Sequence, residues 1–254
     1  MIGVQVDLTR RGRGAPQPVP QPVPDDPFPA DLMAQGGTFH HWAVEEAGAT
    51  WATRHGAARA LSAVGQPGRI TRGGVSFVDC AAGCYDHVAA TPPIAWAPPV
   101  AWSIWLLTDG QRSAAVNLYH GPMVGGANTS STATVYAATQ ARLFLGNPGY
   151  NAQWALPGAG GAESLEWDLP GGSGAALAGI TAWRNGVAMA RSYLNNRGLS
   201  EAGPVLVLGG ARNASGVSVP GGLRIRDVVM TVGWTLGPAQ RAALESYRLA
   251  RLAA

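Results

Sequence analysis

Three acidic residues in and directly before one predicted strand come nearest to acid–base chemistry in this chain. The segment reads Glu163-Ser164-Leu165-Glu166-Trp167-Asp168. Because side chains alternate across a strand, Glu166 and Asp168 share one face and Glu163 lies on the other. Hydrolysis of a glycosidic bond with retention needs two carboxyl groups about 5–5.5 Å apart beside that bond. The next position in register is Pro170, so we interpret Glu166 and Asp168 as solvent-facing strand residues that lack the further carboxylate a catalyst needs.

Possible metal ligands gather around a predicted turn. Cys80, Cys84 and His87 lie close to Asp79 and Asp86, which combines soft and hard ligands within nine residues. A structural zinc site normally needs two close pairs of ligands, and no second pair follows here. A disulfide over so short a loop is geometrically possible, but it is often strained and gains little from loop closure. We therefore expect two reduced thiols at a turn and no zinc.

Other catalytic and binding chemistries find little support. The adjacent His40 and His41 point to opposite faces of a strand, which makes them a poor chelate, and we expect one to be packed and the other exposed. No serine lies in a Gly-x-Ser-x-Gly elbow, and no phosphate-binding loop ends in Lys because the chain has no Lys. The net charge of +3 comes from scattered arginines. A nucleic-acid groove needs clustered cations with interleaved aromatic residues, so we expect no nucleic-acid partner.

A sugar-binding site is the remaining candidate. Glycine-rich stretches at 158–161 and 171–174 predict long loops at one end of the molecule. Aromatic rings near such loops can stack on the C–H faces of pyranose rings, while amides and carboxylates bind the hydroxyl groups. The predicted glycan-binding residues are Tyr150, Asn151, Trp154, Trp167 and Asp168. Most tryptophans are better explained as core residues, and Trp102 and Trp105 should face opposite sides of one strand, with at least one inside.

The elements that would position these residues are predicted to be strands. The 35 Gly and 19 Pro residues are too many for long helices and are typical of short strands joined by turns. We predict strands at 38–44, 50–53, 74–78, 101–108, 114–118, 132–137, 141–145, 153–156, 164–169, 179–184, 187–191, 205–209 and 223–232. Asn185-Gly186 predicts a type I′ hairpin between two of them. After Pro238, the stripe of Leu244, Tyr247 and Arg251 predicts a helix that packs on the sheets.

The first 30 residues differ in kind from the rest. They contain seven prolines, which favour polyproline II and would make 15–29 a stiff spacer on the order of 45 Å long. Before it, Ile2, Val4, Val6 and Leu8 alternate with other residues as in a strand with one apolar face. Such a strand needs a partner sheet in another copy or another protein, and we interpret it as an anchor. The alternative is a disordered tail with accidental alternation.

The N-terminus and the absence of long apolar runs suggest where the protein is made. The alternating start is followed directly by Arg10-Arg11, which is unlike a signal peptide. No apolar run approaches the ~20 residues that span a bilayer. We therefore expect synthesis in the bacterial cytoplasm and no membrane insertion.

The order of several motifs resembles the laminin G-like, concanavalin A-like jelly-roll family. A Trp strand in 50–56 leads to Gly-Val-x-Phe at 74–77, then to Trp-Ser-Ile-Trp at 102–105, the Asn-Gly hairpin, an Ile-x-Asp-Val strand at 225–228 and the final helix. The resemblance covers roughly residues 39–254. It implies an all-β jelly-roll sandwich over 31–254, with a proline-rich arm over 1–30 and a short C-terminal helix.

The resemblance also bears on catalysis and metals. Jelly-roll glucanases carry Glu-x-Asp-x-x-Glu or Glu-x-Asp-x-Glu on a strand face, and the match at Glu166 lacks the last carboxylate. We therefore expect a binding module and not an enzyme. Calcium is common in laminin G-like domains and needs several oxygen ligands, for which Asp79, Asp86 and Asp109 are candidates. No other cofactor is implied.

The arm and the domain together favour one functional hypothesis. A terminal jelly roll behind a strand and a stiff spacer resembles, in composition, head-spike, fibre or tail proteins of phages and gene transfer agents. In this hypothesis residues 1–14 dock on virion capsid or tail proteins, and the jelly roll binds a host cell-surface polysaccharide. Homo-oligomers would compensate weak single-site binding, since multivalency raises avidity ~10²–10⁴-fold. The alternatives are a glycan-degrading enzyme and a purely structural decoration or connector protein.

Overall fold

The computed structural model describes most of the chain from residue 27 onward. The described residues are 27–35, 38–87, 100–110, 116–121, 131–136, 142–147, 150–155, 161–169, 171, 177–195, 206–212 and 218–253. The predicted anchor residues Ile2, Val4, Val6 and Leu8 lie outside this part of the chain. No helix in it is long and apolar enough to cross a membrane.

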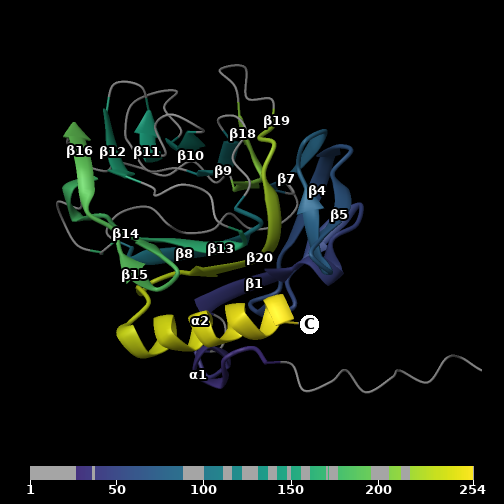
Figure 1. Cartoon of the computed structure of the whole chain (residues 1–254), viewed down its shortest axis with the longest axis horizontal. Coiled ribbons are helices and arrows are strands. Elements are labelled where there is room, and N and C mark those ends of the chain that lie inside the picture. Colours follow the sequence, from purple (N-terminus) through teal and green to yellow (C-terminus); the bar gives the residue numbers. More distant parts are fainter. Residues whose placement is uncertain are drawn as a thin grey trace, which may run out of the picture.

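Two antiparallel sheets form the body of the described chain (Figure 1). Sheet A runs in the order β15-β14-β13-β8-β20-β1-β3, with β6 paired to β20 and β5 paired to β6. Its strands are β1 (Phe39–Ala43), β3 (His55–Gly56), β5 (Gly68–Arg72), β6 (Val75–Asp79), β8 (Trp102–Thr108), β13 (Glu163–Leu169), β14 (Thr181–Arg184), β15 (Val187–Ala188) and β20 (Arg224–Thr231). Strands far apart in sequence are neighbours, as in a sandwich with long-range connections.

Sheet B lies against sheet A. Its order is β16-β12-β11-β10-β9-β17-β7-β4-β2. The strands are β2 (Thr50–Ala52), β4 (Ala60–Gly65), β7 (Gly83–His87), β9 (Val116–Gly121), β10 (Ser131–Tyr136), β11 (Arg142–Asn147), β12 (Tyr150–Ala155), β16 (Arg191–Asn195) and β17 (Val207–Leu208). A separate pair, β18 (Gly210–Arg212) and β19 (Ser218–Pro220), completes the strands of the described chain. Its helical elements are α1 (Ala30–Met33), η2 (Val44–Glu46), η3 (Leu177–Gly179) and α2 (Pro238–Ala253).

The central strands of sheet A are buried on both faces. Every residue of β8 is buried, and alternation sends Trp102 and Trp105 to different sides of it. Trp102 belongs to the apolar cluster between the sheets, whereas Trp105 belongs to a second cluster with Leu244 and Tyr247 of α2. The predicted opposite orientation of the two tryptophans is confirmed. Both faces are filled because the helix supplies a second apolar layer.

Helix α2 covers the outer face of sheet A, as predicted (Figure 1). Leu244 is fully buried and Tyr247 is 2% exposed. Burying such a side chain contributes about 1.5–3 kcal/mol. A polar contact reinforces this packing, since the hydroxyl of Tyr247 donates to Asp227 at 3.0 Å, and Arg251 donates to the same carboxylate at 3.2 Å.

The hairpin between β14 and β15 matches its prediction. Asn185 and Gly186 both have positive φ, at 49° and 73°, which a type I′ turn requires. The strand predicted at 187–191 is shorter than expected, because β15 ends at Ala188. After Met189 and Ala190 the chain reaches sheet B and continues as β16. This crossing from one sheet to the other was not predicted.

The base of the proline-rich arm packs on the domain. Phe28 is 3% exposed and lies in the cluster beneath α2. Its ring stacks on His41 at 4.2 Å and on His55 at 4.8 Å between centroids, and it meets Tyr247 edge-on. The packed part of the chain therefore includes Phe28, three residues before the predicted start of the domain.

Candidate functional site

The carboxylate pair of β13 is sealed beneath α2. Glu166 is 2% exposed and Asp168 7% exposed. Arg241 of α2 approaches both, with its Nη2 2.7 Å from Glu166 Oε1 and 2.6 Å from Asp168 Oδ2. Its guanidinium also lies over the ring of Trp183, 3.6 Å from the centroid. The expectation that Glu166 and Asp168 face solvent was wrong, because the helix covers the face of sheet A on which they lie.

The two carboxyls differ in their environment. Asp168 accepts hydrogen bonds from Ser103, Trp183 and Arg241. Burial raises the pKa of Glu166 to about 8; the negative charge of Asp168 acts in the same direction, and Arg241 only partly opposes it. One guanidinium cannot neutralise two buried carboxylates, which favours the protonated form of Glu166. The pair fastens the helix and is closed to a polysaccharide while α2 is in place.

The residues predicted to bind glycan do not form one surface. Trp154 and Trp167 are 1% and 0% exposed and lie in the core between the sheets. Asp168 lies on the opposite face of β13 from Trp167, beneath the helix. Tyr150 and Asn151 belong to β12, where their backbones pair with Asn147 and Gly146, but their side chains are outside the described part of the structure. Buried indoles offer no face to a sugar, so the prediction fails for both tryptophans.

The calcium candidates do not converge either. Asp109 is paired with Arg224 at 3.2 Å and with Arg72 at 3.4 Å. Asp79 also reaches Arg224, at 3.7 Å, whereas Asp86 is in β7 of sheet B. No group of three or more His, Cys, Asp or Glu side chains gathers for a metal within the described residues. Guanidinium groups already balance two of the three carboxylates.

The two cysteines are separate buried thiols. Cys80 and Cys84 are both free and both buried. Burial raises the pKa of Cys80 far above its usual range and that of Cys84 to about 11. Neither thiol is therefore an activated nucleophile. The predicted turn around Cys84 is wrong in part, since residues 83–87 form strand β7.

The two adjacent histidines are both packed. His41 is fully buried and its Nε2 lies 3.2 Å from Asp227 Oδ1. His40 is 6% exposed, and its Nδ1 lies 2.9 Å from the carbonyl of Ala57. The expectation of one exposed histidine was wrong, since His40 is also buried and its ring contacts the backbone of Ala57, the residue after β3. Although burial disfavours the charged form, His41 and Arg251 hold the pKa of Asp227 below its usual value.

The open site lies where the chain crosses from sheet A to sheet B. All five residues of β16 are exposed. Among the large hydrophobic side chains that are exposed in the described structure, Tyr193 is the aromatic one, and it is 49% exposed. It pairs in register with Gln153 of β12, and the hydroxyl of Ser192 donates to the carbonyl of Gln153 at 3.2 Å. An accessible phenol ring is a suitable surface for stacking on a sugar.

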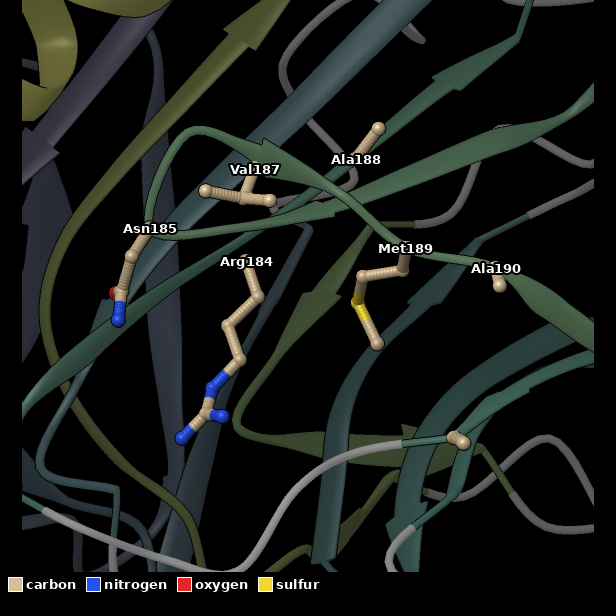
Figure 2. A pocket seen from close by; sticks show the side chains of 7 residues that line it. Arg184, Asn185, Val187, Ala188, Met189 and Ala190 are labelled. Carbon is tan, nitrogen blue, oxygen red and sulfur yellow. The ribbon is translucent and has the colours of Figure 1, made fainter.

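A pocket of about 400 Å³ lies at the β14–β15 hairpin and the two residues that lead from it into β16. Its lining comes from Arg184, Asn185, Val187, Ala188, Met189, Ala190 and Ala155. Figure 2 shows the side chains of Arg184 and Met189 extending to the same side of the hairpin. Asn185 is held in place because its Oδ1 accepts from the backbone N–H of Ser164 at 2.9 Å. The pocket thus combines a cation and an amide with an apolar wall.

Sequence reasoning missed this site. Residues 191–195 lack an alternation of apolar and polar residues, so Tyr193 was not placed on a strand. The available signal was the Asn185-Gly186 turn, which fixes the hairpin that lines the pocket. The path of the chain beyond the hairpin depends on the partner strand β12, because Ser192 bonds to Gln153, 39 positions earlier in the sequence.

Comparison with solved structures identifies the architecture. No family model matches the chain, and no curated protein sequence matches it. The chain is similar to the binding domain of botulinum neurotoxin serotype D/C, with a TM-score of 0.55 and 10% identity over 84% of this chain and 52% of the other. It is also similar to Trypanosoma rangeli sialidase, with a TM-score of 0.56 and 12% identity over 82% of this chain and 32% of the other.

A third similar structure is a single domain. Domain 4 of the arabinanase AbnA from Geobacillus stearothermophilus, solved with arabinotriose, gives a TM-score of 0.54 and 14% identity over 81% of this chain and 97% of that one. The chain thus spans about half of the toxin domain and a third of the sialidase, but nearly all of the arabinanase domain. At these identities the similarity shows the fold. The chain is an all-β protein with a concanavalin A-like jelly-roll sandwich, as its sequence predicted.

Proposed function

We propose that this chain is a non-catalytic carbohydrate-binding module whose site is the edge formed by residues 184–195. The observation that carries the proposal is a pocket of about 400 Å³ with polar and apolar walls at the β14–β15 hairpin, which leads directly into the strand that exposes the ring of Tyr193. The carboxylates that could hydrolyse a glycan are instead buried and held by Arg241. The complex of the similar arabinanase domain with arabinotriose supports a glycan as the ligand class.

The geometry suits a short stretch of sugar. A pocket of this volume accommodates one or two sugar rings, and ligand sites of this kind combine apolar walls with a few fixed polar groups. Asn185 is fixed by Ser164 and Arg184 by Glu163, so little side-chain entropy is lost on binding. Single-site affinity would be weak, and several copies on one surface would raise it.

Replacing the exposed ring tests the proposal. Tyr193→Ala should weaken binding to a glycan found on an array at least tenfold, because stacking area is lost without any effect on the core. Leu249→Ala is the matched control, since Leu249 is 60% exposed on α2, and it should leave binding unchanged. Equal losses of affinity in both variants, or no loss in Tyr193→Ala, would show that the glycan does not bind at this edge.

We further propose that the domain is an adhesion protein of a phage or phage-like particle. Residues 1–14 would attach to capsid or tail proteins, and 15–29 would hold the domain away from the particle. The packing of Phe28 supports this arrangement, because it fixes the root of the arm on the α2 side of the molecule (Figure 1). Strand β16 lies on the other side of the sandwich from α1 (Figure 1), so the part of the site that carries Tyr193 would face outward.

Deleting residues 1–14 tests the attachment. Particles assembled with the shortened chain should lack the protein, while the deleted chain should keep its glycan binding and its melting temperature. A Leu249→Ala chain of full length serves as the control for incorporation. Particles that carry normal amounts of the shortened chain would rule out this segment as the anchor.

A further inference from the structure

Helix α2 contacts strand β13 at two levels. Arg241 and Glu245 are four residues apart, which is a rise of about 6 Å on a helix, and they lie on one face of it. Arg241 pairs with Asp168, and Glu245 accepts a hydrogen bond from the hydroxyl of Ser164. Ser164 and Asp168 share a face of β13 because they are an even number of positions apart. The contact at Ser164 is the one nearest the pocket, since Ser164 also binds the turn of the hairpin.

Ser164 joins the helix to the turn between β14 and β15. Its backbone N–H donates to Asn185 Oδ1 at 2.9 Å, and its carbonyl accepts from the backbone N–H of Asn185 at 3.1 Å. Its side chain is bonded to Glu245 at the same time. One residue of β13 therefore links the helix to Asn185, which lines the pocket.

Glu245 also packs directly on the tip of the hairpin. Gly186 has a positive φ of 73°, and a Cβ atom placed on it would lie 2.7 Å from Cγ of Glu245. The stem of the glutamate thus occupies the space beside the glycine. Its carboxylate is fixed as well, since Trp105 Nε1 donates to Oε1 at 3.4 Å and Arg248 Nε donates to Oε2 at 2.6 Å. With its side chain 16% exposed, Glu245 is held in one position against the turn.

The hairpin depends on such support. Strand β15 has two residues and forms one edge of sheet A, and an isolated two-stranded hairpin is marginally stable in water. Six of the seven described lining residues of the pocket belong to the segment 184–190 (Figure 2), whereas Ala155 comes from β12 of sheet B. The shape of the pocket is therefore set by where the hairpin lies relative to sheet B.

We propose that Glu245 is the positioning residue of this site and that, by holding Ser164 and the Asn185-Gly186 turn, it makes binding in the pocket depend on the docking of α2. This inference rests on the proposed glycan-binding function and adds the control of the site by the helix. Glu245 is not among the described residues that line the pocket. It acts by raising the fraction of molecules whose hairpin is in the binding position, and the apparent affinity scales with that fraction.

Hydrogen exchange at Asn185 measures the turn without any ligand. In the full chain, Glu245→Ala should speed exchange of this backbone N–H about tenfold or more, because a hydrogen bond to a charged group is lost. Exchange of the Ala63 N–H, which donates to the carbonyl of Ala49 at 3.0 Å and reports on sheet B, should not change. Glu245→Gln retains the acceptor and the stem, so it should restore slow exchange. Arg248→Gln is the matched control, since it removes the partner of Oε2 and leaves Oε1 bonded.

The same variants should rank the affinity for a glycan. Calorimetry with an oligosaccharide selected on an array should show that Glu245→Ala binds about threefold to tenfold more weakly than the natural chain. Glu245→Gln and Arg248→Gln should bind like the natural chain. Ser164→Ala removes the same hydrogen bond from the strand side and should change exchange and affinity in the same direction, so it provides the test if Glu245→Ala does not fold.

Three results would overturn the inference. The first is slow exchange at Asn185 in Glu245→Ala, or in Ser164→Ala where that variant is used. The second is faster exchange with unchanged glycan affinity, because the pocket would then not depend on the turn. The third is exchange in Glu245→Gln as fast as in Glu245→Ala. If no oligosaccharide binds the natural chain, the proposed function fails, and the exchange rates alone decide whether Glu245 holds the turn.

Discussion

Individual residues in this protein owe their roles to partners that are distant in sequence. Arg241 is 73 residues from Asp168 and 75 from Glu166, yet its guanidinium decides that these carboxylates are structural. The strand alternation at 163–168 correctly placed Glu166 and Asp168 on one face. The sequence could not show that a helix from the C-terminus covers that face, so their exposure was predicted wrongly.

The unusual pKa of Glu166 predicts a pH-dependent stability. Its pKa rises from 4.5 to about 8 on folding, so the folded state binds the proton more tightly than the unfolded state does. This contribution to stability is complete below pH 4.5 and is lost as the pH rises through 8, by at most about 1.4 kcal/mol per pH unit. Chemical denaturation of Glu166→Gln between pH 5 and 8 should show a flatter dependence than the natural chain.

An exposed glutamate provides the comparison for that experiment. Glu46 lies exposed on η2, and Glu46→Gln should leave the pH dependence of the natural chain unchanged. Parallel curves for the natural chain and Glu166→Gln would show that Glu166 is ionised in the folded protein. The assignment of the proton to Glu166 would then be wrong.

At the scale of elements, the features that depend on residues close together in the sequence were predicted correctly. The Asn185-Gly186 turn, the opposite faces of Trp102 and Trp105 and the stripe of α2 each depend on a few adjacent residues, and all three were predicted. Strand β16 was missed because its pairing with β12 spans a long stretch of chain. The same holds for Phe28, whose place beneath α2 could not be seen in a run of prolines.

The docking of α2 on sheet A can be measured through its buried leucine. Leu244→Ala should lower the free energy of unfolding by about 2–5 kcal/mol, because it leaves a cavity against Trp105 and Leu107. Leu249→Ala on the exposed side should change it by less than about 0.5 kcal/mol. Urea denaturation followed by circular dichroism gives both values, and similar small losses would mean that the helix contributes little to the fold.

At the scale of the whole molecule, both faces of sheet A are covered, whereas one edge of the sandwich is exposed. One face of sheet A packs against sheet B, and the other is closed by α2 together with Phe28. The edge at residues 184–195 combines exposed side chains with a pocket. The proposed binding site therefore lies at the open edge, whereas Phe28, at the root of the arm, is packed beneath α2.

The resemblance of scattered motifs to a jelly-roll family predicted the architecture but not the site. Core motifs such as Trp102-Ser103-Ile104-Trp105 define how the sheets pack, and structures of that architecture at 10–14% identity share it. The site is built at the edge, where Arg184, Met189 and Tyr193 depend on the local path of one connection. The Asn185-Gly186 turn marks the hairpin in the sequence, but no motif marks the positions of Met189 and Tyr193.

The central claim is that the edge at 184–195 binds carbohydrate. Backbone NMR signals of the full chain, recorded during titration with an oligosaccharide selected on an array, test it most directly. We expect the shifted signals to cluster at Arg184, Asn185, Met189 and Tyr193 and to vanish in Tyr193→Ala. Shifts confined to α2, to the arm or to the opposite edge of the sheets would contradict the claim.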